Sequence, residues 1–455
     1  LGPQMKVTRL PGRNPAGCTV HAQEFVRANP RRGLANAAPP RQAKPKMTGM
    51  STQRPRLIAH LDMDAFNASV ELLRYPDLRG QAVVIGGGRD RQPVVQPDGT
   101  RRYATLRDYT GRGVITTCTY EARAFGVHSG MGVMKAARLA PEAVLLPVDF
   151  DEYRRYSQRF KEAVRQVAPV IEDRGIDEIY IDLTDLPGAQ DDAGRAAARA
   201  LKDAVLDATG LRCSIGVTPN KLLSKIASEL DKPDGLTLLD AADIPTRIWP
   251  LAAAKVNGIG PKAAAKLAGF GLHTIGDLAA ADPGFLLAEF GRSYGAWLHA
   301  AAHGRDDRPI VTHREPKSIS CETTFERDLH AVRDRTALSE CFTRLCERLA
   351  ADLKRKGYAT QTVGIKLRYD DFRIVTRDVT LPAAIGDMAA LRRAAGSCLK
   401  RVDLTRRLRL LGVRAGTLVR ADELGASISA AAARPPPSTH QVDLPFIDES
   451  DEATA

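Results

Sequence analysis

The chain has 455 residues, 44% of them hydrophobic and 26% charged, with a formal net charge of +12 at pH 7. These values are typical of a soluble globular protein of roughly two to four domains. No apolar run approaches the roughly 18–20 residues that cross a bilayer, and the N-terminal residues lack an apolar signal region. The seven cysteines form no CxxC pair, which argues against a zinc site or a disulfide framework. We therefore expect a cytoplasmic protein that has no membrane partner.

The positive charge is concentrated in two regions of the chain. Residues 1–56 hold eleven Lys and Arg against a single acid, and residues 316–425 hold 22 basic and 14 acidic residues. The last thirty residues carry −4, which leaves only −2 for residues 57–315. A basic balance within a folded region favours a polyanion as the partner.

Composition and periodicity divide the chain into segments. Residues 1–55 are rich in Pro, Ala, Arg and Gly without periodicity, which predicts a disordered basic tail. Strand-like and helical runs alternate to about residue 239, and short helices with Gly punctuation follow over residues 245–306. Residues 317–419 alternate about four strands with two helices, as in a small α+β domain. The polar tail 426–455 is again predicted to be disordered, apart from one apolar island.

The first strand predicted after the N-terminal tail carries two acids. "LIAHLDMD" (57–64) has the length and apolar content of a buried strand, and its Asp62 and Asp64 point to one face. Two carboxylates on one face are costly unless a cation, a hydrogen bond or a proton compensates them. "AFNASVELL" (65–73) reads as a helix, so Asp64 has the alternative role of a helix cap. That alternative leaves Asp62 without a role.

A long insertion follows this helix. Residues 91–112 have turn and charge signals rather than a core pattern, which predicts a long loop or hairpin. Contact with a partner and a tolerated surface loop are the two interpretations.

A second pair of acids, Asp177 and Glu178, opens the apolar strand "IYIDL" (179–183). Together with Asp62 they would form a three-carboxylate site for hard cations such as Mg²⁺. Two such metals about 3.5–4 Å apart stabilise the attacking and leaving oxygens of phosphoryl transfer. The alternative is that strand-end acids serve as caps or salt-bridge partners.

Cationic groups suited to phosphate lie in two other segments. Tyr120 and Arg123 are three apart on a predicted helical turn, where the guanidinium can grip a phosphate. Lys221 and Lys225 are four apart and so share one helical face. The alternatives are a half-buried Tyr beside a surface Arg, and a solvated stripe of lysines.

Four motifs in order carry a resemblance to a known family: "HLDMDAF…SVE", "YEARAFGVHSGM", "GIDEIYIDLTD" and "SIGVTPNKLLSKIASELDKPDG". From about Leu57 to Val419 the chain resembles the Y-family, or translesion, DNA polymerases, most of all those of the bacterial DNA polymerase IV type. The resemblance implies an α+β multidomain fold, the right-hand polymerase. Its parts would be a palm (56–73 and 150–232), small fingers (74–149), a helical thumb (233–312) and an α+β little finger (316–425).

The same resemblance implies roles for individual residues. Asp62, Asp177 and Glu178 would be catalytic carboxylates that bind two Mg²⁺ ions, with the Met63 carbonyl as a further ligand and Asp64 in a structural role. The nucleotide-binding groups would be the backbone amides of Ala65, Phe66 and Asn67 and the side chains of Tyr120, Arg123 and Lys225.

Asn67 departs from the family pattern. The family usually has Phe or Tyr at this position, where the ring excludes a ribonucleotide 2′-hydroxyl. Asn67 is smaller, and Phe66 would point elsewhere on a helix. The hypothesis is that sugar discrimination is weakened and that ribonucleotides are incorporated.

Two further segments resemble contact motifs. "VNGIGPKAAAKLAGFGLHTIGDLAAAD" (256–282) resembles a helix-hairpin-helix, in which Gly258 and Gly260 would allow a turn that grips a DNA phosphate. "QVDLPF" resembles a sliding-clamp-binding peptide, with Gln441, Leu444 and Phe446 as anchors on a flexible tether. The alternatives are a simple connector and a chance match.

The implied function is template-directed, low-fidelity DNA synthesis across damaged templates, as part of DNA repair and damage tolerance. Primer–template DNA, nucleoside triphosphates and a sliding clamp would be the partners of a monomeric enzyme. One alternative is a catalytically inactive, clamp-tethered DNA-binding scaffold of the same fold, and another is a two-metal nuclease. Retention of Asp62, Asp177 and Glu178 favours the polymerase over the scaffold.

Overall fold

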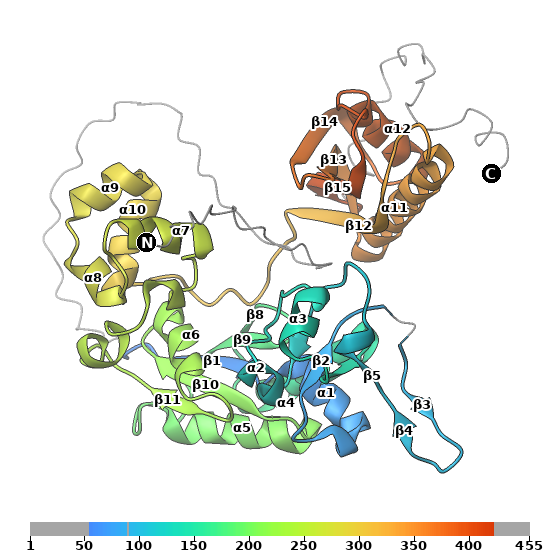
Figure 1. Ribbon diagram of the computed structural model, residues 1–455. Helices are drawn as coiled ribbons and strands as arrows, with labels where there is room; N and C mark the ends of the chain where they lie inside the picture. Colours follow the sequence, from blue (N-terminus) through green and yellow to red (C-terminus); the bar gives the residue numbers. More distant parts are fainter. Residues whose placement is uncertain (1–53, 89–90, 423–455) are drawn as a thin grey trace, which may run out of the picture. The chain divides into compact units, whose positions relative to one another are not determined.

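The computed structural model describes residues 54–88 and 91–422 (Figure 1). Contacts divide these residues into two compact units: residues 54–109 with 115–314, and residues 110–114 with 315–422. The predicted tails and the peptide 441–446 lie outside the described residues. Within the described ranges, no helix combines the length and the apolar character that crossing a membrane requires.

A five-stranded sheet forms the centre of the first unit. Its strand order is β11-β10-β1-β9-β8, and β1 pairs antiparallel with both β9 and β10. Every residue of β1 is buried except Asp62, which is half-buried, because the strand is central and covered on both faces. The strands are β1 (Ile58–Met63), β8 (Ile171–Asp173), β9 (Glu178–Asp182), β10 (Cys213–Thr218) and β11 (Leu236–Leu238).

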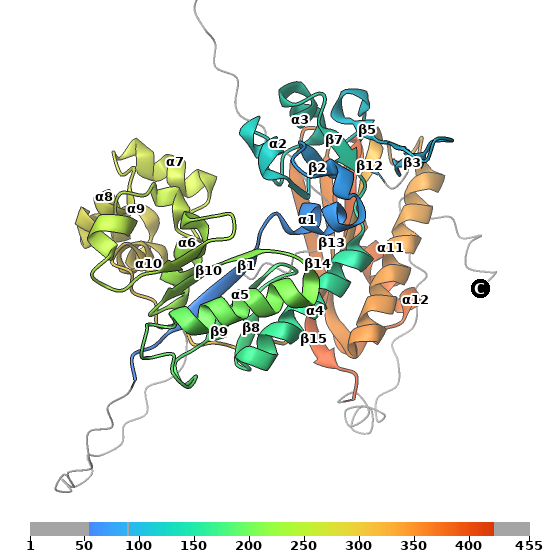
Figure 2. The same ribbon diagram turned by 90° about the horizontal axis from the view of Figure 1, so that it is seen from below.

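Helices cover the two faces of this sheet. Ala59, Leu61 and Met63 of β1 share a core with apolar residues of α4 and α5, which lie side by side (Figure 2). His60 and Asp62 alternate to the other face, against which α6 packs. The approach of α6 requires Gly216 in β10, since a Cβ there would lie 2.4 Å from backbone atoms of α6. These helices are α1 (Phe66–Arg74), α4 (Phe150–Val167), α5 (Arg195–Thr209) and α6 (Lys221–Leu230).

A smaller four-stranded sheet, with strand order β5-β7-β2-β6, follows α1. The predicted insertion does contain a hairpin, β3 paired with β4. The expectation that it lacks a core pattern is wrong for residues 104–109, because β5 pairs with β7 and both Leu106 and Tyr109 are buried. The elements are η1 (Pro76–Leu78), β2 (Val83–Ile85), β3 (Val94–Val95), β4 (Arg101–Arg102), β5 (Ala104–Thr105), η2 (Leu106–Asp108), β6 (Thr117–Cys118), α2 (Tyr120–Ala124), α3 (Val133–Leu139) and β7 (Val144–Leu146).

The short helices predicted over 245–306 are present (Figure 1). They pack around buried Leu267, Leu278, Leu286 and Leu298. They are η3 (Ile244–Ile248), η4 (Ala253–Lys255), α7 (Pro261–Gly269), α8 (Ile275–Ala280), α9 (Pro283–Phe290) and α10 (Arg292–Ala302).

The second unit has the predicted two helices among four strands. Its antiparallel sheet has the order β12-β15-β13-β14, and its core includes residues of α11 and α12. The elements are β12 (Ser318–Leu329), α11 (Arg335–Lys356), β13 (Tyr358–Tyr369), β14 (Ile374–Ile385), α12 (Met388–Leu399) and β15 (Leu408–Arg420).

Candidate active site

Two of the three predicted carboxylates, Asp62 and Glu178, meet on the face of the central sheet that α6 covers. β1 and β9 run antiparallel with Asp62 directly opposite Glu178. Asp177 immediately precedes β9, and its carbonyl oxygen accepts a 3.0 Å hydrogen bond from the Met63 amide. One ligand atom each of His60, Asp62 and Glu178 lies within 4.8 Å of the others. The sheet register therefore gathers acids that are more than a hundred residues apart in the sequence.

Burial makes the charge of two of these acids costly. It raises the pKa of Asp62 to about 6, although the Lys232 ammonium group opposes this shift. Burial also raises the pKa of Asp177, and the neighbouring charge of Glu178 adds to the effect. A bound cation would offset the cost of charging these buried carboxyl groups. The donor set therefore fits divalent metal ions that prefer oxygen ligands.

Two lysines lie against the carboxylates as cationic partners. Lys225 of α6 contacts Glu178, and Lys232, two residues beyond the end of α6, contacts Asp62. Lys232 also lies 2.7 Å from Glu229. Burial works against the charge of Lys232, but Asp62 and Glu229 raise its pKa above the ordinary value. No sequence pattern points to Lys232, because α6 ends at Leu230 and a spacing of seven residues from Lys225 then no longer indicates a shared helical face.

Lys221 has a different partner from Lys225. Its ammonium group contacts Glu172, and both side chains are almost completely buried. The same group lies 4.9 Å from the centre of the Tyr180 ring. The interpretation of Lys221 and Lys225 as a solvated stripe is therefore wrong, because each lysine pairs with an acid on the sheet.

Asp64 is satisfied by hydrogen bonds within the fold. Its carboxylate accepts bonds from the Ser214 hydroxyl at 2.9 Å, the Asp234 amide at 2.7 Å and the Tyr120 hydroxyl at 3.3 Å. The N-cap of α1 is Ala65, with φ 45°, and it has no side-chain cap. The helix-cap alternative for Asp64 is therefore wrong, and the structural role is confirmed.

Tyr120 and Arg123 lie on α2, whose N-cap Thr119 accepts a hydrogen bond from the Ala122 amide. The Arg123 guanidinium lies 4.6 Å from the centre of the Tyr120 ring. Burial and the charge of Asp64 raise the pKa of Tyr120 to about 12. Tyr120 is half-buried and Arg123 is exposed, as the alternative interpretation expected. The hydrogen bond from the Tyr120 hydroxyl to Asp64 nevertheless connects Tyr120 and Arg123 to the end of β1, the strand that carries Asp62.

The two residues after Ala65 point in different directions. Phe66 packs its ring edge-on against Tyr153 and Phe160, at centroid distances of 6.5 and 6.3 Å. Phe66 therefore points into the core of the first unit. Asn67 is only 5% exposed, and its amide group has no hydrogen-bond partner among the residues described.

The turn before α7 requires glycine at Gly258 but not at Gly260, whose φ of −76° is open to any residue. Gly258 has φ +116°, and a Cβ there would lie 2.6 Å from the Trp297 ring. Gly260 is the N-cap of α7 and has open space beside it. Contact of this turn with DNA stays a prediction.

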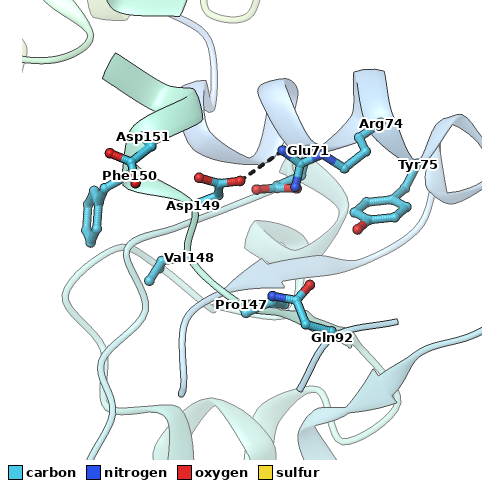
Figure 3. Close-up of a pocket in the computed structure, with 9 residues that line it drawn as sticks. All are labelled: Glu71, Arg74, Tyr75, Gln92, Pro147, Val148, Asp149, Phe150 and Asp151. Carbon is cyan, nitrogen blue, oxygen red and sulfur yellow. Dashed lines mark hydrogen bonds and ion pairs between the residues drawn. The ribbon is translucent and has the colours of Figure 1, made fainter. Parts of the chain in front are cut away.

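A pocket of about 210 Å³ lies elsewhere in the first unit (Figure 3). Its only basic side chain, Arg74, lies 2.9 Å from Asp149 and 3.5 Å from Glu71. None of its lining residues belongs to the carboxylate site. Because Arg74 is paired with two acids, this pocket offers no cationic group that could bind a phosphate. The candidate active site is therefore the carboxylate site on the central sheet.

Comparisons with known proteins agree with this geometry. The impB/mucB/samB family model matches residues 61–229, and the model of that family's C-terminal domain matches residues 316–428. The DNA polymerase IV of Streptomyces coelicolor is 39% identical over 358 residues, which are 78% of this chain and 70% of that protein. The DNA polymerase IV of Methanoculleus marisnigri is 38% identical over 363 residues, 80% of this chain and 94% of that protein.

A solved structure has the same fold. The Y-family DNA polymerase chimera Dbh-Dpo4(243-245)-Dbh matches with a TM-score of 0.66 and 22% identity, over 80% of this chain and 99% of that one. The fold class predicted from the sequence, a right-hand polymerase, is confirmed. The chain therefore belongs to the Y-family DNA polymerases, within the impB/mucB/samB family, and its sequence groups it with DNA polymerase IV.

Proposed function

We propose that this DNA polymerase binds two Mg²⁺ ions through Asp62, Asp177 and Glu178 and uses them to extend a primer 3′-hydroxyl as a template directs. The observation that carries the proposal is the convergence of Asp62 and Glu178 with the ammonium groups of Lys232 and Lys225. Asp177 immediately precedes Glu178, and burial together with the charge of Glu178 raises the pKa of Asp177. The Met63 carbonyl, at the same strand end, is the proposed additional ligand.

Two Mg²⁺ ions held by Asp62, Asp177 and Glu178 would supply the positive charge that lowers the pKa of the attacking hydroxyl and offsets the charge of the phosphates. The contribution of the chain is positioning and fixed charge. The rigid antiparallel pairing of β1 with β9 keeps Asp62 and Glu178 opposite each other. Lys225 and Lys232 pair with the carboxylates in the absence of substrate, and in this proposal both ammonium groups also bind the triphosphate. The primer hydroxyl attacks the α-phosphate, and pyrophosphate leaves.

The proposed triphosphate site consists of Tyr120, Arg123 and Lys225, to which we add Lys232. The backbone amides of Ala65 to Asn67 extend it, because α1 begins without a side-chain cap and its first amides point outward from the helix end. Asn67 is the proposed sugar-discrimination residue. Its short amide, in place of an aromatic ring, supports relaxed selection against ribonucleotides.

The proposed DNA contacts lie in other segments. The turn at Gly258 and Gly260 would hold a phosphate, and the net charge of +8 over residues 316–425 suits the DNA backbone. Gln441, Leu444 and Phe446 are the proposed clamp anchors of a monomeric, cytoplasmic enzyme. Low fidelity, translesion synthesis and the domain boundaries given above belong to the same proposal.

Primer extension with Mg²⁺ tests the function, with Asp177→Asn as the control. We expect nucleotide-dependent lengthening by the wild type and none by the variant. Tight primer–template binding without lengthening would instead identify a scaffold. Metal-dependent shortening without nucleotide would identify a nuclease.

A further inference from the structure

His60 is a fully buried imidazole beside the proposed metal site that the mechanism above does not use. It lies on β1 two residues before Asp62 and therefore on the same face. Its ring packs against Tyr180, its cross-strand partner, at a centroid distance of 4.7 Å. Nδ1 lies 2.8 Å from the Ser228 hydroxyl of α6, and Nε2 lies 3.5 Å from Oε2 of Glu178.

The surroundings of the ring decide which nitrogen carries the proton. Nε2 is buried without a hydrogen bond among the residues described, and the carboxylate of Glu178 is the acceptor it faces. The ammonium group of Lys225 also contacts this carboxylate, as a cation paired with its negative charge. A lone pair on Nε2 would repel that ionised carboxylate, so the proton belongs on Nε2. With the proton on Nε2, the Ser228 hydroxyl donates to Nδ1 at 2.8 Å in place of the Lys225 carbonyl, which lies 3.0 Å from the same hydroxyl.

We propose that His60 is a positioning residue whose Nε2–H orients Oε2 of Glu178, so that Oε1 is free to face the metal ion. The inference rests on the assignment of Glu178 to the metal site in the proposed function. Lys225 contacts the same oxygen, but it is also a proposed triphosphate group. When Lys225 turns to a phosphate, His60 is the partner that keeps Glu178 in place. Ser228 and Tyr180 prevent the ring from turning away, and such outer contacts commonly govern metal affinity.

Two substitutions of His60 distinguish the hydrogen-bonding roles of its two ring nitrogens. In His60→Gln the amide NH₂ can occupy the position of Nε2 and donate to Glu178. In His60→Asn the amide reaches the position of Nδ1 and Ser228 but not Glu178. We expect His60→Asn to weaken Mn²⁺ binding about tenfold or more, and His60→Gln to stay within about twofold of the wild type. Mn²⁺ affinity is measured by electron paramagnetic resonance on the full chain without DNA or nucleotide.

Primer extension supplies the second measurement. The Mg²⁺ concentration for half-maximal extension rises in His60→Asn by a similar factor, whereas the rate at saturating Mg²⁺ is largely retained. Equal Mn²⁺ affinities in the Gln and Asn variants would overturn the proposal, because a ring that only fills space makes no such distinction. Ser228→Ala leaves β1 intact and is expected to weaken Mn²⁺ binding by a smaller factor. If His60→Asn does not fold, unchanged Mn²⁺ affinity in Ser228→Ala overturns the proposal.

Glu178→Gln separates failure of this proposal from failure of the site assignment. Mn²⁺ binding that survives Glu178→Gln would show that Glu178 is not a metal ligand, and the proposed site would then fail. Binding that is lost in Glu178→Gln but unchanged in His60→Asn would overturn the positioning role alone.

Discussion

Lys232 places its ammonium group directly against the carboxylate of Asp62, 170 positions earlier in the chain. The contact is an ion pair between two largely buried groups, with side-chain exposures of 13% and 16%. It links the strand that carries the first proposed metal ligand to the segment after α6. In the proposed site this lysine would serve both the carboxylate and a triphosphate.

Replacing Lys232 by Met is expected to raise the KM for deoxynucleotides by about tenfold or more, because a charged hydrogen bond contributes about 1.5–3 kcal/mol. Steady-state single-nucleotide insertion measures this value. Lys135→Met is the matched control, since Lys135 is an exposed lysine of α3 and its loss should leave KM unchanged. An unchanged KM in Lys232→Met would remove this residue from the triphosphate site.

Asp177→Asn is expected to abolish extension yet raise the melting temperature in EDTA. Burial and Glu178 raise the pKa of Asp177, so its charge destabilises the metal-free fold and a neutral amide relieves that cost. A relief of about 1 kcal/mol corresponds to an increase of about 2–4 °C in Tm. Differential scanning fluorimetry with and without Mg²⁺ checks it: adding Mg²⁺ should raise the Tm of the wild type and not of the variant. A lower Tm for Asp177→Asn in EDTA would contradict this account of the charge.

Asn67→Phe is expected to lower ribonucleotide use relative to deoxynucleotide use by about tenfold or more, because a ring there would oppose the 2′-hydroxyl sterically. The ratio of kcat/KM for the two sugars on one template measures the effect. Asn67→Ala keeps the position small and should retain the wild-type ratio. If Asn67→Phe also keeps that ratio, while its deoxynucleotide kinetics show an intact enzyme, Asn67 does not set sugar selection.

Glu172→Ala is expected to destabilise the first unit by about 3–5 kcal/mol, the cost of breaking a buried ion pair from one side. The completely buried carboxylate contacts Lys221, lies 2.6 Å from Arg314 and accepts a 2.9 Å bond from the Val311 amide. Denaturant unfolding followed by circular dichroism measures the loss.

The double variant Glu172→Gln with Lys221→Met serves as the control for this prediction. It removes both charges and should recover part of the stability lost by Glu172→Ala. A loss below about 1 kcal/mol in the single variant would show that Glu172 does not stabilise this region.

Asp334 is expected to make the stability of the second unit depend on pH. Hydrogen bonds from Arg327 and from the His330 amide lower the pKa of Asp334 to about 2. Because the pKa in the folded protein lies below the ordinary value of 3.8, the stabilisation is complete above about pH 4 and is lost as pH falls towards 2. The Tm deficit of Asp334→Asn should therefore shrink over that interval. The exposed Asp207→Asn control should show no such convergence, and a pH-independent deficit for Asp334→Asn would contradict the prediction.

Local pattern predicted much of the fold and the acidic part of the site. The apolar run 57–64 with its period-two acids identified the central strand, since a buried strand must be apolar wherever it packs. The position of Glu178 at the start of its strand, together with the family motifs, predicted that this acid lies beside Asp62. The insertion was predicted less well, because Leu106 and Tyr109 are isolated among turn residues and their burial depends on β7.

Tertiary structure alone decided the partners of the cationic and imidazole groups. Lys221 and Lys225 share a helix face, yet one contacts Glu172 and the other Glu178, because neighbouring sheet strands present the two acids at different points along α6. Lys232 and His60 acquire their roles only through sheet register and the close packing that Gly216 permits. Sequence spacing describes one element at a time, whereas an ion pair depends on the distance between side chains that different elements bring together.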